Sequence, residues 1–212
     1  MRFFFLCILV LFSPALCGAS DLVDAARAQI GRTVLYDGSY QALAYPGGDV
    51  PVKRGVCSDV VIRALRACCG MDLQQLVHED MQAHFSEYPQ NWGLATTDTN
   101  IDHRRVPNLY TYFQRQGYAL PVSADPEDYR PGDLVTCTVP PHLPHIMIVS
   151  DRKNRQGIPL VIHNIGLGTV EEDRLFAFSI TGHFRIENSG QGAGASLVPL
   201  SRKPCPLLMT VQ

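Results

Sequence analysis

The sequence has little net charge, no Cys-x-x-Cys pair and, after its first residues, no long hydrophobic run. Its 18 basic and 20 acidic residues give a formal charge of −2, which is too balanced to indicate binding to nucleic acid or to an acidic membrane surface. Without a Cys-x-x-Cys pair, a structural zinc site is not expected. Hydrophobic residues make up 46% of the 212 positions, which suits one globular domain of roughly 170–190 residues.

The first residues have the layout of a secretory signal peptide. Arg2 supplies an early positive charge, and an apolar run follows over residues 3–12. The run is shorter than the ~20 residues that a membrane span needs, and cleavage after Cys17 or Ala19 fits the small-residue rule. We therefore expect a signal peptide over residues 1–19 and an exported protein, periplasmic or secreted, with no remaining membrane span. A membrane anchor and a lipoprotein acylated at Cys17 are the alternatives.

Export changes what the cysteines can do. If Cys7 and Cys17 leave with the signal peptide, five cysteines remain: Cys57, Cys68, Cys69, Cys137 and Cys205. Because five is an odd number, at least one thiol stays free unless chains cross-link. Up to two disulfides can form in an oxidising compartment, and the spacing does not identify their partners.

The mature chain has a helical first half and a β-rich second half. Hydrophobic spacing predicts helices over residues 21–31, 57–69, 73–85 and 107–117, the first with Asp21 as its N-cap. Four short β-rich segments follow and predict an antiparallel meander: GDLVTCTV, HIMIVSD, PLVIHNIG and AFSITGHFRI. Helices followed by a sheet indicate an α+β domain over residues 20–186. Residues 187–212 are expected to be a flexible linker and tail.

Cys57 stands at the start of the second predicted helix, two residues after Gly55. Free N–H groups of the first helical turn would point at its sulfur, and the helix dipole would lower the pKa of its thiol. The same N–H groups can hold the oxyanion that forms when a thiolate attacks a carbonyl. A buried structural cysteine is the alternative. Cys68 and Cys69, at the far end of the helix, are expected in the core or in disulfides.

A cysteine nucleophile needs a base, usually histidine, that a third polar group orients. His145 begins HIMIVSD, and His163 lies in the next β-rich segment. If the hairpin folds about Asn154, the two histidines are directly opposed and point to the same face. A one-residue slip would replace His163 by Asn164. His142, in a proline-rich loop, is the rival base.

These motifs resemble the NlpC-type papain-like cysteine peptidases of bacterial cell walls. The resemblance rests on YPGGDVPVKRGVCSD, PGDLVTC and HIMIV, which occur in the family's order over roughly residues 20–185. It implies a papain-like fold, in which N-terminal helices precede the sheet and the nucleophile helix packs on the antiparallel meander. It also implies that Cys57 is the nucleophile, His145 the base and His163 the residue that orients the base.

The same resemblance suggests supporting residues. The tyrosine that helps to form the oxyanion site would be Tyr45, with Tyr36 as its competitor. Ser58 follows the nucleophile as a serine does in the family, and Asn164 is the alternative third residue. More closely, GVCSDVVIRA, LVHEDM and NIDHRRVPNL resemble an exported bacterial family of unknown function within that superfamily. Val-Cys-Ser-Asp replaces the common Asp-Cys-Ser-Gly, and the long interval before PGDLVTC can reshape the substrate cleft.

A charged motif, NIDHRR, precedes the last predicted helix. Its Asp102, His103, Arg104 and Arg105 form a candidate substrate site, since arginines can grip a carboxylate of an acidic peptide bidentately. A solvated loop with an internal Asp–Arg pair is the alternative. The segment HEDMQAH has residue types that bind metals, but no ligand geometry follows from its spacing, so no metal is expected.

The sequence therefore predicts an exported cysteine hydrolase that cleaves amide bonds in peptidoglycan stem peptides through an acyl-enzyme on Cys57. The predicted reaction requires no metal or organic cofactor. Two alternatives stay open. One is an acyl or amide transferase with the same three residues, and the other is a non-catalytic wall-binding domain in which Cys57 is locked in a disulfide.

Overall fold

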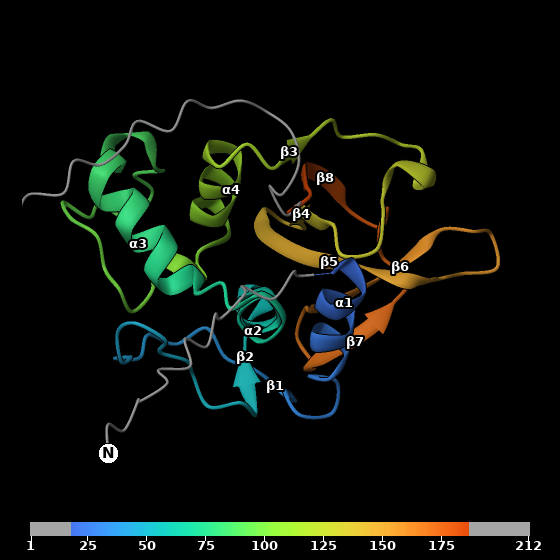
Figure 1. Ribbon diagram of the computed structural model, residues 1–212, viewed down its shortest axis with the longest axis horizontal. Helices are drawn as coiled ribbons and strands as arrows, with labels where there is room; N and C mark the ends of the chain where they lie inside the picture. Colours follow the sequence, from blue (N-terminus) through green and yellow to red (C-terminus); the bar gives the residue numbers. More distant parts are fainter. Residues whose placement is uncertain (1–17, 187–212) are drawn as a thin grey trace, which may run out of the picture.

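The computed structural model describes residues 18–186, which form four helices and a six-stranded sheet (Figure 1). The helices are α1 (Ala19–Arg27), α2 (Cys57–Cys69), α3 (Leu73–His84) and α4 (Val106–Arg115), with short 3-10 helices η1 (Phe85–Glu87), η2 (Asp102–Arg104) and η3 (Pro126–Asp128). The strands of the main sheet are β3 (Ala119–Leu120), β4 (Leu134–Val139), β5 (Leu143–Lys153), β6 (Pro159–Asn164), β7 (Thr169–Glu172) and β8 (Ser179–Phe184). A separate parallel pair joins β1 (Leu35–Tyr36) to β2 (Arg54–Gly55).

The expected α+β class is correct.

All but the last two residues of the expected signal peptide lie outside the described residues. The expected tail, residues 187–212 with Cys205, lies outside them as well. Within residues 18–186, no helix has the length and apolar character that crossing a membrane requires.

The sheet is antiparallel throughout, in the order β3-β8-β4-β5-β6-β7. The predicted meander is correct for β4, β5 and β6, which pair in sequence. The prediction that the last β-rich segment extends the meander is wrong, because β8 returns to pair with β4. In that position β8 satisfies the backbone groups along one edge of β4 that a simple meander would leave open.

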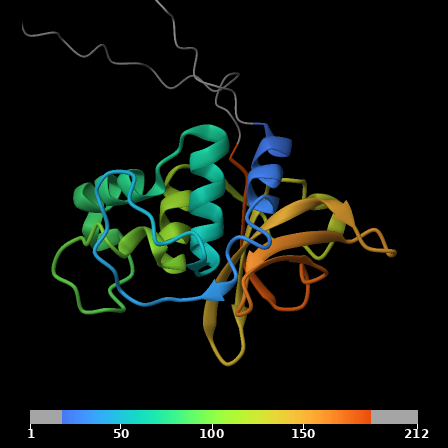
Figure 2. The same ribbon diagram turned by 90° about the horizontal axis from the view of Figure 1, so that it is seen from below.

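Helix α2 occupies the centre of the molecule, with α1 and the sheet on one side and α3 and α4 on the other (Figures 1 and 2). Its Val61 and Leu65 are fully buried with Ile146 and Ile148 of β5. Gly70 ends α2 in the left-handed conformation, as the sequence predicts. The packing fixes the start of α2 against the start of β5.

Two sequence-based details differ at the first helix. It begins at Ala19, after Gly18, and not at the predicted cap Asp21. Asp21 lies in the first turn instead, where its carboxylate accepts a hydrogen bond from the N–H of Gly18 at 3.2 Å. A carboxylate in a first helical turn stabilises the helix dipole, so Asp21 still marks the start of the helix.

Candidate active site

Helix α2 begins at Cys57 because Asp59 holds the residue before it. The Asp59 carboxylate accepts a hydrogen bond from the N–H of Val56, the N-cap residue, at 2.6 Å. This bond stabilises the first turn of the helix. Cys57 itself is only 3% exposed. The backbone N–H groups of Ile146, Ser58 and Cys57 lie close enough to its sulfur to favour a negative charge on it. The nucleophile candidate therefore lies at a helix start and against the backbone of β5.

The pKa of the Cys57 thiol is raised, whereas the sequence-based expectation is a lowered pKa. Burial raises this pKa to about 11, and the three N–H groups offset only part of that effect. Desolvation disfavours a charged sulfur more strongly than the helix terminus favours it. Cys57 is consequently a neutral thiol at physiological pH.

His145 and His163 meet across the sheet, as expected. Nε2 of His145 and Nδ1 of His163 are 2.7 Å apart, and both rings are buried. The predicted register is wrong by two residues, because Ile148 pairs with Ile162, which places His163 opposite Met147. The hairpin turn is centred later than Asn154. A register shift of two residues keeps both histidines on the same face of the sheet. Their rings therefore meet diagonally across the two strands.

Glu172 extends this pair into a chain of three side chains. Its Oε1 lies 2.9 Å from Nε2 of His163. A carboxylate accepts only, so Nε2 of His163 carries the proton and Nδ1 accepts the proton on Nε2 of His145. This assignment leaves Nδ1 of His145 free to act as a base. The sequence analysis missed Glu172 because β7 has too little hydrophobic signal to be recognised as a strand.

Cys57 lies beside the backbone of Ile146, the residue that follows His145 in β5. No hydrogen bond joins its sulfur to the His145 ring within residues 18–186; the sulfur contacts the N–H of the next residue, Ile146. Cys137 pairs directly with His145 in the sheet. Burial, followed by the charge of Cys57, raises the pKa of the Cys137 thiol. Catalytic contacts often tighten only when substrate binds. The rival base His142 lies in the exposed turn between β4 and β5.

The tyrosine beside Cys57 is Tyr36 and not Tyr45. Tyr45 packs on His78 of α3, with ring centroids 5.1 Å apart. Tyr36 pairs with Gly55 of β2 and lines the same cleft as Cys57. Burial, followed by the charge of Cys57, raises the pKa of Tyr36. The closer of the two tyrosines in sequence is therefore the more distant one in space.

Ser58 and Asn164 hold the backbone around the nucleophile. The Ser58 hydroxyl donates to the carbonyl of Arg104 at 2.7 Å, and the Asn164 side chain donates to the carbonyl of Gly55 at 2.9 Å. Both side chains are fully buried. Asn164 therefore anchors the strand that leads into Cys57, whereas His163 contacts the His145 ring.

The NIDHRR motif is buried, so the alternative of a solvated loop is wrong. Arg104 is 5% exposed and forms a bidentate ion pair with Asp59, with both N···O distances at 2.9 Å. Because both nitrogens bind Asp59 of α2, Arg104 has a structural role and is not available to bind a substrate carboxylate. His103 is buried as well, and burial lowers its pKa to about 4. The internal Asp–Arg pair exists between Asp102 and Arg105, at 3.2 Å.

The residues of HEDMQAH serve structural contacts. Asp80 accepts hydrogen bonds from Tyr88 and Arg115, and His84 lies 3.4 Å from Asp80. Within the described part of the chain, no group of three metal-binding side chains comes together.

The cysteines differ in state. Cys57 and Cys137 carry free thiols within the described residues. Cys69, the last residue of α2, is disulfide-bonded. The disulfide chemistry therefore belongs to the far end of α2, as the dipole argument predicts.

Cys57 is one of the residues that line an open cleft of about 540 Å³. Its walls come from the β1 region, the segment before η2, and the starts of α2, α4 and β5: Tyr36, Gly38, Tyr40, Val56, Cys57, Asn91, Trp92, Ile101, Arg104, Arg105, Val106, Pro107 and Pro144. The long interval noted in the sequence thus builds one wall of the cleft.

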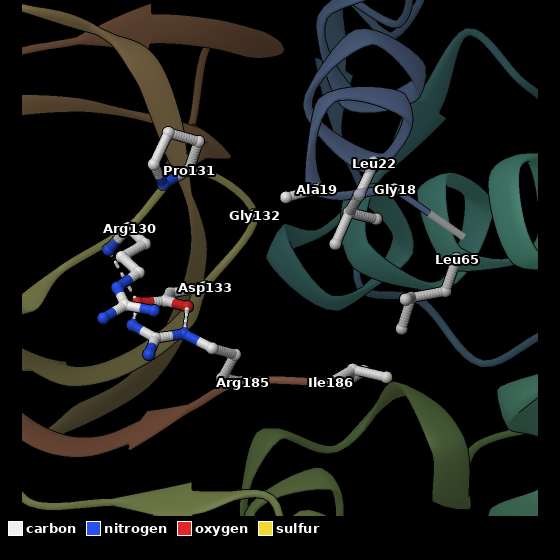
Figure 3. A pocket seen from close by; sticks show the side chains of 10 residues that line it. All are labelled: Gly18, Ala19, Leu22, Leu65, Arg130, Pro131, Gly132, Asp133, Arg185 and Ile186. Atoms are coloured by element: carbon white, nitrogen blue, oxygen red, sulfur yellow. Dashed lines mark hydrogen bonds and ion pairs between the residues drawn. The ribbon is translucent and has the colours of Figure 1, made fainter. Parts of the chain in front are cut away.

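The Pro-Gly-Asp motif lies elsewhere, in a pocket beside the start of α1 (Figure 3). Its Asp133 is buried and accepts hydrogen bonds from Arg185 and His183, each at 2.7 Å. These bonds tie β4 to β8. The motif therefore supports the sheet and takes no part in the Cys57 cleft.

Comparison with known proteins places the chain in a family. Residues 23–186 match the family described as "Domain of unknown function (DUF1287)". The chain belongs to this family. It is also 57% identical over 164 residues to the "Uncharacterized protein YijF" of Escherichia coli (strain K12), an alignment that covers 77% of this chain and 80% of the relative. The expected membership of a family of unknown function is confirmed, and neither match names a peptidase.

Proposed function

We propose that this protein is a cysteine amide hydrolase with Cys57 as its nucleophile. The observation that carries the proposal is the series of hydrogen bonds from His145 through His163 to Glu172. It begins one residue before Ile146, whose backbone N–H favours a charge on the Cys57 sulfur. Such a chain fixes the tautomer of a base.

The proposed reaction starts from a neutral thiol and a neutral imidazole. As the Cys57 sulfur attacks an amide carbonyl, its proton passes to Nδ1 of His145, and the positive charge is stabilised through His163 by Glu172. The oxyanion is held by N–H groups at the start of α2 and by the Tyr36 hydroxyl. The amine leaves with the proton from His145, and water, deprotonated by His145, resolves the acyl-enzyme.

The proposed substrates are peptide amides of the bacterial cell wall, cleaved outside the cytoplasm. Support comes from the resemblance of the motifs to NlpC-type papain-like peptidases, from the signal-peptide layout of residues 1–19 and from the similarity to a bacterial protein. An acyl transferase would share the acyl-enzyme and differ only in its acceptor. The free thiol of Cys57 weighs against a binding domain that locks this residue in a disulfide.

Digestion of purified peptidoglycan tests the proposal. The mature protein is expected to release new amino and carboxyl termini in equal amounts, seen by mass spectrometry of the soluble products. Cys57→Ala and His163→Ala should abolish the release. Release by Cys57→Ala at the wild-type rate, or no release from peptidoglycan or from isolated stem peptides, would contradict it. With an added amine, a transferase would give the aminolysis product instead.

A further inference from the structure

The cleft beside Cys57 carries positive charge on one wall. Among the described residues that line it, Arg104 and Arg105 are basic and none is acidic. Asp59 neutralises Arg104 through the buried bidentate pair. Arg105 is paired as well, with Asp102, but through one nitrogen only, so Arg105 is the cation whose other N–H groups can bind a ligand.

Arg105 is held in a defined orientation. Its guanidinium carbon lies 4.0 Å from the centre of the Trp92 ring, and one N–H donates to Asp102 at 3.2 Å. This side chain is 17% exposed, whereas that of Asp102 is 1% exposed. The anchoring carboxylate thus lies behind the guanidinium, and the described residues provide no hydrogen-bond partner for its Nε and second terminal nitrogen. A planar fork fixed on an aromatic face is well suited to a carboxylate.

Two helix starts add to the positive potential. Helix α2 begins at Cys57 and helix α4 at Val106, and both residues line the cleft. Each helix start carries a partial positive charge from its unpaired N–H groups. Because Arg105 is the residue directly before α4, its charge and the dipole of α4 act on the same volume.

The cleft continues past Pro107 and Pro144 into a groove of different character. This groove has a volume of about 420 Å³, and its lining contains hydroxyl groups but no charged side chain: Pro89, Val106, Pro107, Tyr110, Thr111, Thr136, Cys137, Thr138, Pro144 and Thr181. A substrate that spans both parts meets a cation at one end and neutral hydrogen-bonding groups at the other.

We infer that Arg105 determines specificity by binding a carboxylate of the substrate, and that the part of the substrate in the threonine-lined groove is uncharged. The inference rests on the proposed function, because it names the substrate class of the same Cys57 site: amides that carry a carboxylate on one side of the bond. Asp102 and Trp92 are positioning residues that keep the guanidinium in place.

Two alkylating reagents of similar size test the inference. Iodoacetate is an anion and iodoacetamide is neutral, so the ratio of their rates at Cys57, divided by the same ratio for glutathione, reports attraction of a carboxylate. Mass spectrometry of the Cys57 peptide gives both rates. We expect a normalised ratio well above one, falling by about tenfold in the double variant Asp102→Asn/Arg105→Gln. The double variant avoids leaving Asp102 buried without its partner.

Arg155→Gln is the matched control, because it makes the same substitution in the exposed turn after β5. It should leave the ratio unchanged, which separates local binding from net charge. A wild-type ratio no higher than that of glutathione, or one that survives the double variant, overturns the inference.

A second measurement keeps the inference independent of the chemistry. In Cys57→Ala, binding of N-acetylglutamate is compared with that of N-acetylglutamine by calorimetry. A preference for the acid that the double variant removes supports the carboxylate site even if Cys57 is inert to both reagents, in which case the proposed function fails alone. No preference for the acid overturns the inference whether or not Cys57 reacts.

Discussion

Burial keeps both members of the proposed catalytic pair uncharged at rest. It raises the pKa of Cys57 to about 11 and, together with the neighbouring His163, lowers the pKa of His145 to about 3. A thiolate–imidazolium pair would require the opposite order of pKa values. Proton transfer must therefore accompany attack on the substrate and cannot precede it.

The first prediction concerns the charge of Cys57. Since the pKa of its thiol lies above the ordinary value of 9.0, the thiol stays protonated through neutral pH and ionises only above about pH 9. The difference in ultraviolet thiolate absorbance between the wild type and Cys57→Ala, followed from pH 5 to 11, should be flat until then. A His145-dependent thiolate signal at pH 6 would show that a resting ion pair forms.

The second prediction concerns Glu172 as a positioning residue. Glu172→Gln can still accept the proton of His163 but lacks the charge that stabilises the imidazolium, so the acylation rate of Cys57 should fall about tenfold. Glu172→Asp should restore part of the rate, and the pH at half-maximal rate should move in the Gln variant. Glu127→Gln, in the exposed 3-10 helix η3, is the control. If the acylation rate and its pH profile are unchanged in Glu172→Gln, Glu172 is not a positioning residue of the candidate site.

At the scale of elements, one buried ion pair connects the segment before α4 to the nucleophile helix. Arg104 of η2 binds the Asp59 carboxylate and also donates to the backbone carbonyls of Asp37 and Ser39. Three parts of the chain meet at this guanidinium: η2, the first turn of α2 and the loop after β1. The start of α2 is thereby held from the side that faces the cleft.

The third prediction follows from that pair. Arg104→Met leaves the carboxylate of Asp59, which is 2% exposed, without its cation, and should lower the free energy of unfolding by about 3–5 kcal/mol. Asp59→Asn/Arg104→Met should recover part of the loss. Urea titration provides the measurement. The control is Arg152→Gln, which removes an exposed arginine whose partner Glu171 keeps its ion pair with Arg27; it is expected to cost under about 1 kcal/mol. Equal costs for the two arginines would contradict the structural role of Arg104.

The sequence predicts these elements well where one segment supplies all the information. Helix α2 (Cys57–Cys69) and the part of β5 formed by HIMIVSD follow from local spacing, although β5 begins two residues earlier, at Leu143. The return of β8 to β4 and the later hairpin turn do not, because they depend on pairing between distant strands. Glu172 is missed because it lies on a strand without hydrophobic alternation. Tyr36 is ranked behind Tyr45 because it reaches the Cys57 cleft only through the pairing of β1 with β2.

At the scale of the whole molecule, several buried histidines make folding sensitive to acid. Burial lowers the pKa of His145 to about 3 and that of His103 to about 4, and it lowers the pKa of His163 as well. All three bind protons more readily when the chain is unfolded. The stability of the fold is therefore coupled to the same burial that tunes the candidate site.

The fourth prediction is the resulting pH dependence. The stability is fully present above the ordinary histidine pKa of 6.5. As the pH drops from 6.5 toward the lowered pKa values, the stability falls by up to about 1.4 kcal/mol per pH unit for each group. Urea titrations at pH 7.5, 6 and 5 should show a falling free energy of unfolding. His103→Asn should reduce the slope. A free energy that is constant from pH 7.5 to 5 would contradict the buried, neutral state of these rings.

The most direct test of the account is acylation of Cys57 by the activated ester p-nitrophenyl acetate. We expect a burst of about one equivalent of p-nitrophenol with the acetyl group on Cys57, slowed about 100-fold or more in His145→Ala and unchanged in His142→Ala, which removes the rival base of the exposed turn. If the burst is absent, or equally fast without His145, then Cys57 and His145 are not a nucleophile and its base.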